Sequence, residues 1–503
     1  MSLGSPHMHA RAALASIAIV LSLGAGLAPA QDGETQRSEL DALRREVEEL
    51  RRRDEEYRRM LEALEQRIDE LSAPTADALD AELSTPAADA LDAALEESTP
   101  AVEPTEPATD TDLWSRPVGN ADVRLIDLSL DVMMAGGWSS VGNDRIEELQ
   151  AGAHDPNQRG FTLQQAEISF AGAVDPYFTA AAYVVATDDE VELEEAFATT
   201  TGLPYGLQLE AGYFLTEFGI INPRHAHAWH WVDQPLINSR LFGGEGLRST
   251  GFRLGWLLPT PWFSQLDWGL QSADPGCCAK SFLDGDVGGR PSAGHSVNDP
   301  TDLIWLARWS NSWDLGPETT SVVGLSGLYG PNSTGGAGET WIYGMDLKLR
   351  WRPDDNFRGF PFVEWQTEIM KRDYRADGFV AGATSVDDPA FDQDLASETL
   401  DDAGGYTQLL WGFRPQWAAG LRFEYAGGSG GSVEDGAPVG RDTDPRRDDR
   451  LRISPLLTWW PTHFSRLRLQ YNYDDADHLP SDGAHSFWLS LEVQYGRHGA
   501  HDY

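Results

Sequence analysis

The stretch WIYGMDLKLRWR at residues 341–352 decides the fold, because its side chains alternate between two characters. Apolar and aromatic residues occupy the odd positions, and Asp346, Lys348 and Arg350 stand between them. A β-strand points successive side chains to opposite faces, so one face of this segment is apolar and the other is charged. The same alternation occurs in 125–134 and 487–495. Strands of this kind are typical of a transmembrane β-barrel, whose apolar face contacts lipid.

Strands of this kind can be placed along the chain from residue 121 to its end. Their connections alternate between short turns and mostly long loops, as a barrel with short periplasmic turns and long outer loops requires. Tryptophans near the strand ends, such as Trp351 and Trp459, fit interfacial girdles and argue against a soluble β-sandwich or propeller. We therefore predict an all-β transmembrane fold, an antiparallel outer-membrane β-barrel of about sixteen strands over 121–503. The predicted strands start near residues 123, 161, 177, 191, 205, 250, 262, 302, 319, 340, 360, 405, 416, 450, 463 and 485.

The composition agrees with an exported barrel and excludes one class of partner. The 503 residues include 80 acidic and 38 basic side chains, so the formal net charge is −42, which argues against binding nucleic acid. The mean hydropathy is −0.40, but lumen residues offset lipid-facing ones in such an average. The acid-rich outer loops predict a preference for cations. Their acids are Asp387, Asp388, Asp392, Asp394, Asp401 and Asp402.

The N-terminal residues have the pattern of a secretory signal. An apolar run over 12–27 precedes the small residues Ala28-Pro29-Ala30, which predicts a signal peptide at 1–30. No later stretch has the roughly 18 apolar residues that a transmembrane helix needs. We expect the chain in the outer membrane of a Gram-negative cell, in contact with its lipid.

A coiled coil is predicted ahead of the barrel, at 31–72. Apolar or aromatic residues fill nine of the ten a and d positions between Leu40 and Leu71, and acids and arginines fill the intervening positions. This seam allows a dimer or a trimer. Residues 73–120 are rich in Pro, Ala, Thr and acids, which predicts a solvated linker. An even strand count puts the coiled coil in the periplasm, where it can reach peptidoglycan.

Alternation assigns charged side chains to the barrel interior. Acids lie on the early strands and arginines on the later ones, so a closed barrel sets them on opposing walls with a field between them. The alternative is that these charges solvate a wide lumen or pair laterally. The predicted pore-lining residues are Glu167, Glu192, Glu194, Glu210, Arg350, Arg352, Arg414, Arg422, Arg452, Arg466 and Arg468, together with Glu245 of an outer loop.

The loop at 219–249 holds a cluster of histidines. His225 and His227 face one side of an extended segment, a spacing that suits zinc, and His230 needs a turn to join them. Asp233 is the nearby carboxylate. We predict these four residues as candidate metal ligands, with packing at the channel rim as the alternative. No other cofactor is predicted.

Two further features bear on function. Cys277 and Cys278 are adjacent, so they form a vicinal disulfide, cap a loop or are an incidental pair. The chain has no G-x-S-x-G motif and no convincing base near a serine, so we do not expect an enzyme.

The layout resembles trimeric sixteen-stranded outer-membrane porins, which implies a homotrimer whose third loop narrows the pore. A local segment, FGIINPRHAHAWHWVDQPLINSRLFGG at 218–244 with GFRLGWLLPTPWF at 251–263, resembles the barrels labelled zinc-regulated TonB-dependent outer-membrane receptors. That resemblance implies that His225 and His227 belong to the motif. Such a receptor carries a plug and 22 strands, for which 121–503 is too short.

The sequence thus predicts a porin that passes small hydrophilic solutes, including divalent metal ions such as zinc, through a water-filled pore narrowed by 219–249. The alternatives are an outer-membrane zinc receptor or transporter, and a structural tether between the outer membrane and the cell wall.

Overall fold

The computed structural model describes residues 115–118, 121–124, 126–188, 190–285, 287–381, 393–434, 436–480 and 483–496. The predicted signal peptide, coiled coil and most of the linker lie outside these residues. Strand β1 (Ser115–Val118) lies within the range predicted as linker and pairs with β2 (Ala121–Arg124) in a hairpin. Among the described residues, no helix has the length and apolar character needed to cross a membrane.

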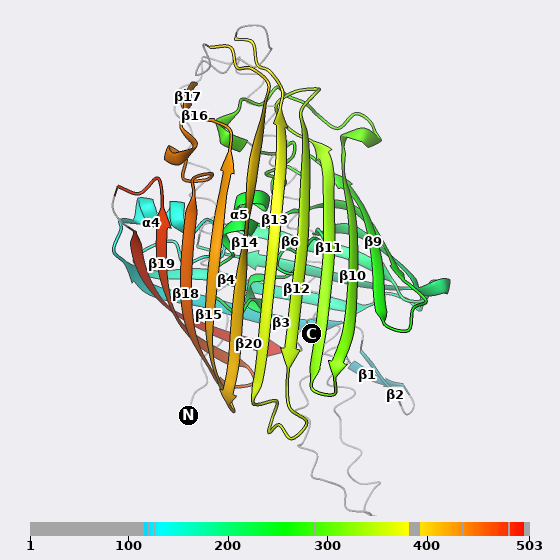
Figure 1. Ribbon diagram of the computed structural model, residues 1–503. Helices are drawn as coiled ribbons and strands as arrows, with labels where there is room; N and C mark the ends of the chain where they lie inside the picture. Colours follow the sequence, from blue (N-terminus) through cyan, green and yellow to red (C-terminus); the bar gives the residue numbers. More distant parts are fainter. Residues whose placement is uncertain are drawn as a thin grey trace, which may run out of the picture. The chain divides into compact units, whose positions relative to one another are not determined.

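Sixteen antiparallel strands form one closed barrel, as the alternating pattern predicts (Figure 1). Neighbours in sequence pair around the barrel, and the last strand pairs with the first from Ser486 opposite Ser139 to Gly496 opposite Ser129. The strands are β3 (Asp127–Ser139), β4 (Gly160–Ala173), β5 (Phe178–Ala186), β6 (Val191–Thr200), β7 (Leu207–Leu215), β8 (Arg248–Leu257), β9 (Phe263–Ser272), β10 (Leu303–Gly316), β11 (Thr319–Pro331), β12 (Glu339–Trp351), β13 (Phe362–Ala376), β14 (Glu398–Arg414), β15 (Trp417–Ser429), β18 (Arg450–Thr462), β19 (Ser465–Ala476) and β20 (Ala484–Gly496).

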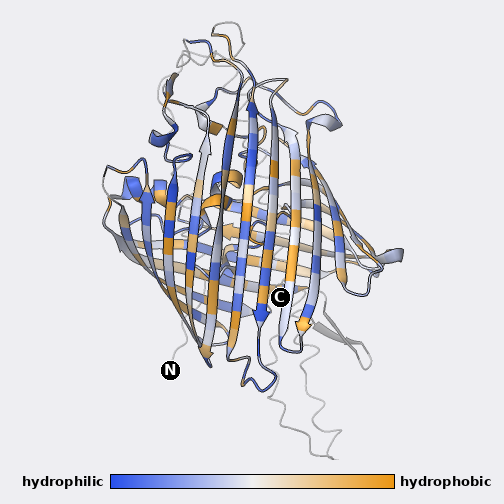
Figure 2. Cartoon of the chain, in the orientation of Figure 1, coloured by the Kyte–Doolittle hydropathy of each residue, from blue (hydrophilic) through white to orange (hydrophobic). Residues whose placement is uncertain are grey.

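The two faces of the barrel wall differ as the sequence alternation predicts. On β20, Phe487 and Leu489 are about half exposed, whereas Ser490 and Glu492, at alternate positions of the same strand, are buried. The exposed side chains are apolar and face outward, and the buried polar ones face the interior. Figure 2 shows the resulting alternation of hydrophobic and hydrophilic residues along the strands. This arrangement inverts that of a soluble protein, whose outer face is polar.

The connections also alternate in length. Those after β4, β8, β10, β14 and β18 are tight turns, whereas 216–247, 273–302 and 430–449 are long. The long connections carry the local elements α4 (Asn143–Leu149), α5 (Leu236–Phe242), β16 (Ser432–Glu434) and β17 (Ala437–Val439). Aromatic side chains gather at the turn end, where Trp417 stacks on Trp459 with ring centroids 5.6 Å apart.

An apolar core lies where the connection between β7 and β8 packs against the inner wall. Phe218, Ile237, Leu241 and Phe242 of this connection are buried together with wall residues. The wall contributes Leu306, Leu328, Ile342 and Met370, from β10, β11, β12 and β13. The inward-facing apolar residues of these strands therefore form the surface on which the loop packs. This packing positions the part of the loop that carries the charged site.

Candidate functional site

The connection 216–247, called the crossing loop below, runs through the barrel interior. Residues 231–242 are all buried, and α5 lies within the barrel in Figure 1. The loop enters at Ile220 and Ile221, whose backbone N–H groups donate to Glu368 of β13 at 2.6 and 3.2 Å. Farther along, the Leu236 N–H donates to Glu424 of β15 at 2.7 Å. These bonds tie the loop to strands far from β7 and β8.

One end of the crossing loop meets glutamates of β4 and β6. His225 Nδ1 lies 2.7 Å from Glu194 Oε2, and its Nε2 lies 2.7 Å from Glu195 Oε2. Glu167 Oε2 lies 3.3 Å from His225 Nδ1 and 3.1 Å from His227 Nδ1. Ionised carboxylates only accept hydrogen bonds, so both nitrogens of His225 donate and the ring is an imidazolium.

The charges around His225 keep it protonated. Burial alone lowers the pKa of this histidine, but the negative charges of Glu194 and Glu167 outweigh burial and hold the pKa well above its ordinary value. For His227 burial likewise acts to lower the pKa, and Glu167 raises it above the ordinary value. The two rings stack with centroids 5.6 Å apart. The loop therefore presents positive charge to this acidic wall.

The middle of the crossing loop presents negative charge to the arginine wall. Asp233 is fully buried and pairs with Arg422 of β15 and with Arg452 Nη1 of β18 at 3.0 Å. Gln470 and Asn472 of β19 donate to the same carboxylate at 2.8 and 2.7 Å. Burial alone raises the pKa of Asp233, but the two arginines outweigh it and hold the pKa below its ordinary range.

The backbone between His225 and Asp233 also contacts arginines. Arg466 Nη1 donates to the Trp229 carbonyl at 3.0 Å, and Arg468 Nη1 donates to the Trp231 carbonyl at the same distance. The Arg422 guanidinium lies over the Trp231 ring, 5.5 Å from its centroid. The loop therefore covers the predicted arginines Arg422, Arg452, Arg466 and Arg468, which face the interior and are buried beneath it.

The four predicted metal ligands do not come together. His225 and His227 share Glu167, as described above, but His230 Nε2 pairs with Glu364 Oε1 of β13 at 2.8 Å. Asp233 is held by arginines, which repel a cation. The physical reason is that the loop spans the interior, so residues a few positions apart reach different walls.

The predicted pore-lining residues fall into two groups. Glu167, Glu192, Glu194 and Glu210 face the interior and are paired there, Glu192 with Arg248 at 2.5 Å and Glu210 with Arg253 at 3.2 Å. Arg350 is half-buried on β12. Arg352 and Arg414 instead lie exposed at the turn end, where Arg414 stacks over Trp417 with 5.0 Å to the ring centroid.

Sequence reasoning missed several residues of this interior. Glu364 and Glu368 stand at alternate positions of β13, so the period-two pattern could have revealed them. Arg248 lies at the first position of β8, where a strand start is hard to place. His154 lies in the connection before β4, and nothing in the sequence indicates its partners.

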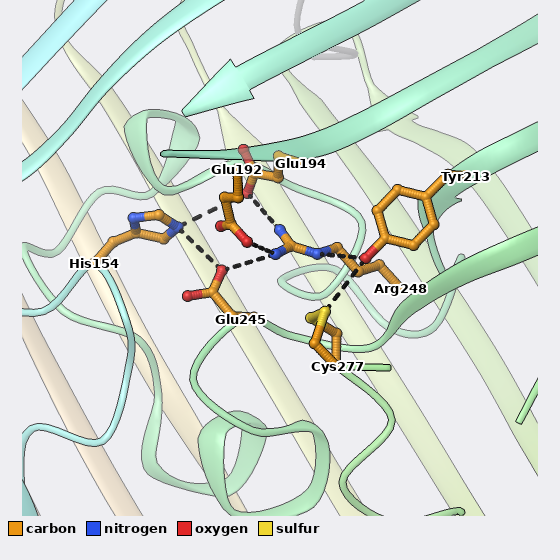
Figure 3. The surroundings of a disulfide bond; sticks show 8 residues. His154, Glu192, Glu194, Tyr213, Glu245, Arg248 and Cys277 are labelled. Atoms are coloured by element: carbon orange, nitrogen blue, oxygen red, sulfur yellow. Dashed lines mark hydrogen bonds and ion pairs between the residues drawn. A yellow bond between two sulfur atoms is a disulfide. The ribbon is translucent and has the colours of Figure 1, made fainter. Parts of the chain in front are cut away.

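The adjacent cysteines form a vicinal disulfide, with an S–S distance of 2.07 Å. Cys277 Sγ lies 3.5 Å from the Tyr213 hydroxyl, and the Arg248 Nε donates to that hydroxyl at 3.2 Å (Figure 3). The Arg248 backbone N–H donates to the Cys278 carbonyl at 3.3 Å. Of the alternatives for the cysteine pair, the structure has the disulfide, which lies beside Arg248.

Comparison with known proteins gives a relative and several structures of similar fold. No protein-family model matches the chain. An uncharacterized protein of Aquifex aeolicus is 27% identical over 380 residues, which cover 69% of this chain and 73% of that protein. The outer membrane channel DcaP of Acinetobacter baumannii is similar over 74% of this chain and 97% of its own, with TM-score 0.47 and 11% identity. OmpT of Vibrio cholerae is similar over 74% of this chain and 97% of its own, with TM-score 0.41 and 7% identity.

An anion-selective porin from Comamonas acidovorans is similar over 74% of this chain and 99% of its own, with TM-score 0.41 and 8% identity. The strand pairing from β3 to β20 defines the fold of this chain. The chain is a closed sixteen-stranded antiparallel β-barrel whose interior is crossed by a loop held between an acidic and a basic wall.

Proposed function

We propose that the chain is an outer-membrane channel that lets small hydrophilic solutes diffuse through a barrel narrowed by the crossing loop. One observation carries the proposal: a closed barrel with an apolar exterior encloses charged side chains and a loop tied to both walls. A sixteen-stranded barrel is wide enough to enclose an aqueous path. A soluble container has no need for a barrel-wide apolar exterior.

The paired walls give the proposed channel its selectivity. Carboxylates of β4 and β6 lie on one side of the crossing loop and guanidinium groups of β15, β18 and β19 on the other. These groups are buried against the loop, so a passing solute senses their field and does not contact them. Such an arrangement orients charged and dipolar solutes and slows apolar ones. As the more specific solutes we propose divalent metal ions such as zinc. The histidines of the loop lie among carboxylates, and zinc binds both imidazole nitrogens and carboxylate oxygens.

The test is reconstitution of the full chain into planar bilayers and into liposomes. We expect discrete conductance steps, liposome swelling with small sugars, and slower swelling as the sugar grows. A salt gradient then gives the reversal potential, and cation preference is expected from the acidic outer surface. Absence of both conductance and swelling would contradict a channel, whereas clear anion selectivity would contradict only the charge preference.

The predicted coiled coil carries a separate proposal. A homotrimer joined through 31–72, with the coil reaching toward peptidoglycan, would make the chain a tether as well as a channel. Deletion of 31–120 distinguishes these roles. We expect conductance to persist in the deleted chain, and loss of trimers alone would assign the coil to assembly.

A further inference from the structure

We propose that His154, Glu194 and Glu245 form a binding site for a divalent cation, with Glu192 as a further carboxylate. His154 lies in the connection between β3 and β4, the two strand glutamates lie on β6, and Glu245 lies at the end of the crossing loop. Ligand atoms of His154, Glu192 and Glu245 all lie within 4.8 Å of one another. Figure 3 shows the imidazole and the carboxylates pointing toward a common point. The proposal concerns binding and does not depend on channel activity.

The histidine is held with one nitrogen directed at the carboxylates. His154 Nδ1 lies 3.2 Å from the Gln164 carbonyl oxygen, which can only accept, so Nδ1 carries a hydrogen. The Gln164 amide in turn donates to the His154 carbonyl at 2.8 Å. The side chain is 4% exposed, and its Nε2 has no hydrogen-bond partner among the described residues. Metal-binding histidines are oriented in this way, through a bond from the other ring nitrogen.

The distances suit an ion better than a shared proton. His154 Nε2 lies 3.8 Å from Glu194 Oε1 and 3.7 Å from Glu245 Oε2. An N–H···O hydrogen bond is shorter, at roughly 2.7–3.2 Å. Two ligands bonded to one tetrahedral zinc at about 2.0–2.1 Å lie about 3.4 Å from each other. His154 would therefore need only a small movement toward either carboxylate to coordinate one cation with it.

The charge balance also calls for a cation. Because Glu194 also pairs with the His225 imidazolium, the two clusters are counted together. Their five glutamates (Glu167, Glu192, Glu194, Glu195 and Glu245) face three positive charges, on Arg248, His225 and His227. The Arg248 Nη1 lies 3.6 Å from Glu194 Oε1 and its Nη2 lies 3.2 Å from Glu245 Oε2, so the guanidinium pairs with the same two oxygens that face His154 Nε2. A formal charge of two remains, which a divalent ion neutralises. Uncompensated buried carboxylates are costly, so this excess favours uptake of an ion.

The nearby His225 cluster is a weaker candidate, although Glu167, Glu194 and His225 also lie within 4.8 Å of one another. Both nitrogens of His225 are already in hydrogen bonds of 2.7 Å, so an ion there must displace a proton and break these bonds. Glu194 belongs to both clusters, with Oε2 toward His225 and Oε1 toward His154. The proposed ion therefore occupies the second face of a carboxylate that already anchors the crossing loop.

A cation at this point would join three separate segments. It would link the connection before β4, strand β6 and the end of the crossing loop that leads into β8. The bound ion would thus fix the C-terminal end of the crossing loop to the acidic wall.

Calorimetric titration of the full chain in detergent, stripped with a chelator, tests the site with Zn²⁺ and separately with Mn²⁺. We expect one ion per chain. H154Q and E245Q should each weaken binding by at least about 10-fold, because loss of an outer-shell partner alone costs about 10–100-fold. H225Q leaves every proposed ligand in place and removes only the partner of Glu194 Oε2, so it should weaken binding less than H154Q does. H295Q is the matched control, because His295 Nε2 is already bonded to Asp302 at 3.0 Å.

Three results would overturn the proposal: no binding by the wild-type chain, full binding by H154Q, or loss of binding through H225Q alone. Heat-modified electrophoretic mobility checks that each variant is folded. If H154Q does not fold, H154C titrated with Cd²⁺ takes its place. A thiolate-to-cadmium absorption band supports the site, and its absence in a folded H154C chain contradicts it.

Discussion

At the scale of the residue, Asp233 shows how the crossing loop is held. Its carboxylate is fully buried and accepts from Arg452, Gln470 and Asn472, with Arg422 also paired to it. Arg422 also pairs with Glu424 and Arg452 with Asp474, each at 2.7 Å, so Asp233 is the carboxylate that the two arginines share. Loss of its charge would leave each buried arginine with one carboxylate fewer, which is destabilising.

D233N is predicted to destabilise the chain and loosen the loop. The asparagine keeps the size of the side chain and removes its charge, so the free energy of unfolding should fall by about 1.5–3 kcal/mol, the contribution of a hydrogen bond to a charged group. Denaturant titration of the barrel in lipid vesicles measures this change, and the unitary conductance should rise. Asp442 is exposed in the connection after β17, so D442N is the control and should leave both quantities unchanged. Equal effects of the two variants would contradict the anchoring role.

His225 predicts how the attachment depends on pH. Its folded-state pKa lies above the value of about 6.5 expected in an unfolded chain. The stabilisation by Glu194 and Glu195 is therefore fully present below pH ~6.5 and is lost as the pH rises through the raised pKa. Hydrogen exchange in 220–230, corrected for the intrinsic rate, should show loosening at alkaline pH. H225Q should flatten this dependence, and loosening of the wild-type loop on acidification would contradict it.

At the scale of the element, the crossing loop depends on a sharp turn at its entry. Gly219 has φ 67°, and a Cβ there would lie 2.0 Å from Glu368 Oε1. The same glutamate accepts from the next two backbone N–H groups. A side chain at 219 would therefore be strained and would displace the carboxylate that receives the loop.

G219A is predicted to release the start of the loop. The backbone strain alone destabilises by more than about 0.4–1 kcal/mol, and displacement of Glu368 adds to it. The matched control is G294A, since Gly294 also has φ 67° and a Cβ there meets nothing within 4 Å. Limited proteolysis and conductance should separate the two variants. If G294A opens the channel as much as G219A, backbone strain and not the contact with Glu368 is responsible.

The strands could be predicted from the sequence, whereas the path of the loop could not. Alternation is local, so a strand such as β20 is visible in a few consecutive residues. Strand β14 begins at Glu398, before the predicted start at 405, because the acids and glycines of 401–405 interrupt the apolar pattern. The His225 and His227 spacing marked the right part of the loop, but their glutamate partners lie on strands that are distant in sequence. His154 went unassigned for the same reason, since its position says nothing of Glu194 or Glu245.

At the scale of the whole molecule, the exterior is the feature that places the chain in a membrane. Apolar side chains such as Leu489 and Met345 are about half exposed on strands of the barrel wall. In water such a surface would drive aggregation, whereas lipid covers it without cost. The expected location of the chain in a membrane thus depends on outward-facing side chains, which make no contact with the candidate site.

L489R is predicted to destabilise the barrel in lipid by about 2–4 kcal/mol, the cost of a lipid-facing arginine near the bilayer midplane. Leu489 and Val380 are exposed by 52% and 54%, and Val380 lies outside the strands in the connection before β14. V380R is therefore a control with matched exposure and should change the stability little. Unfolding in vesicles measures both variants. Equal tolerance of arginine at the two positions would argue against a lipid-facing wall.

The anchoring of the crossing loop also bears on the order of assembly. The bond from Arg466 to the His227 carbonyl joins residues 239 positions apart, and that from Arg452 to Asp233 joins residues 219 apart. Contacts between such distant positions form slowly, because a long segment must be ordered before they can stabilise it. The contacts of the loop with the basic wall can form only after β18 and β19 have joined the sheet, whereas its contacts with Glu194 and Glu195 need only strand β6. We therefore expect docking against the basic wall to be the later of the two steps.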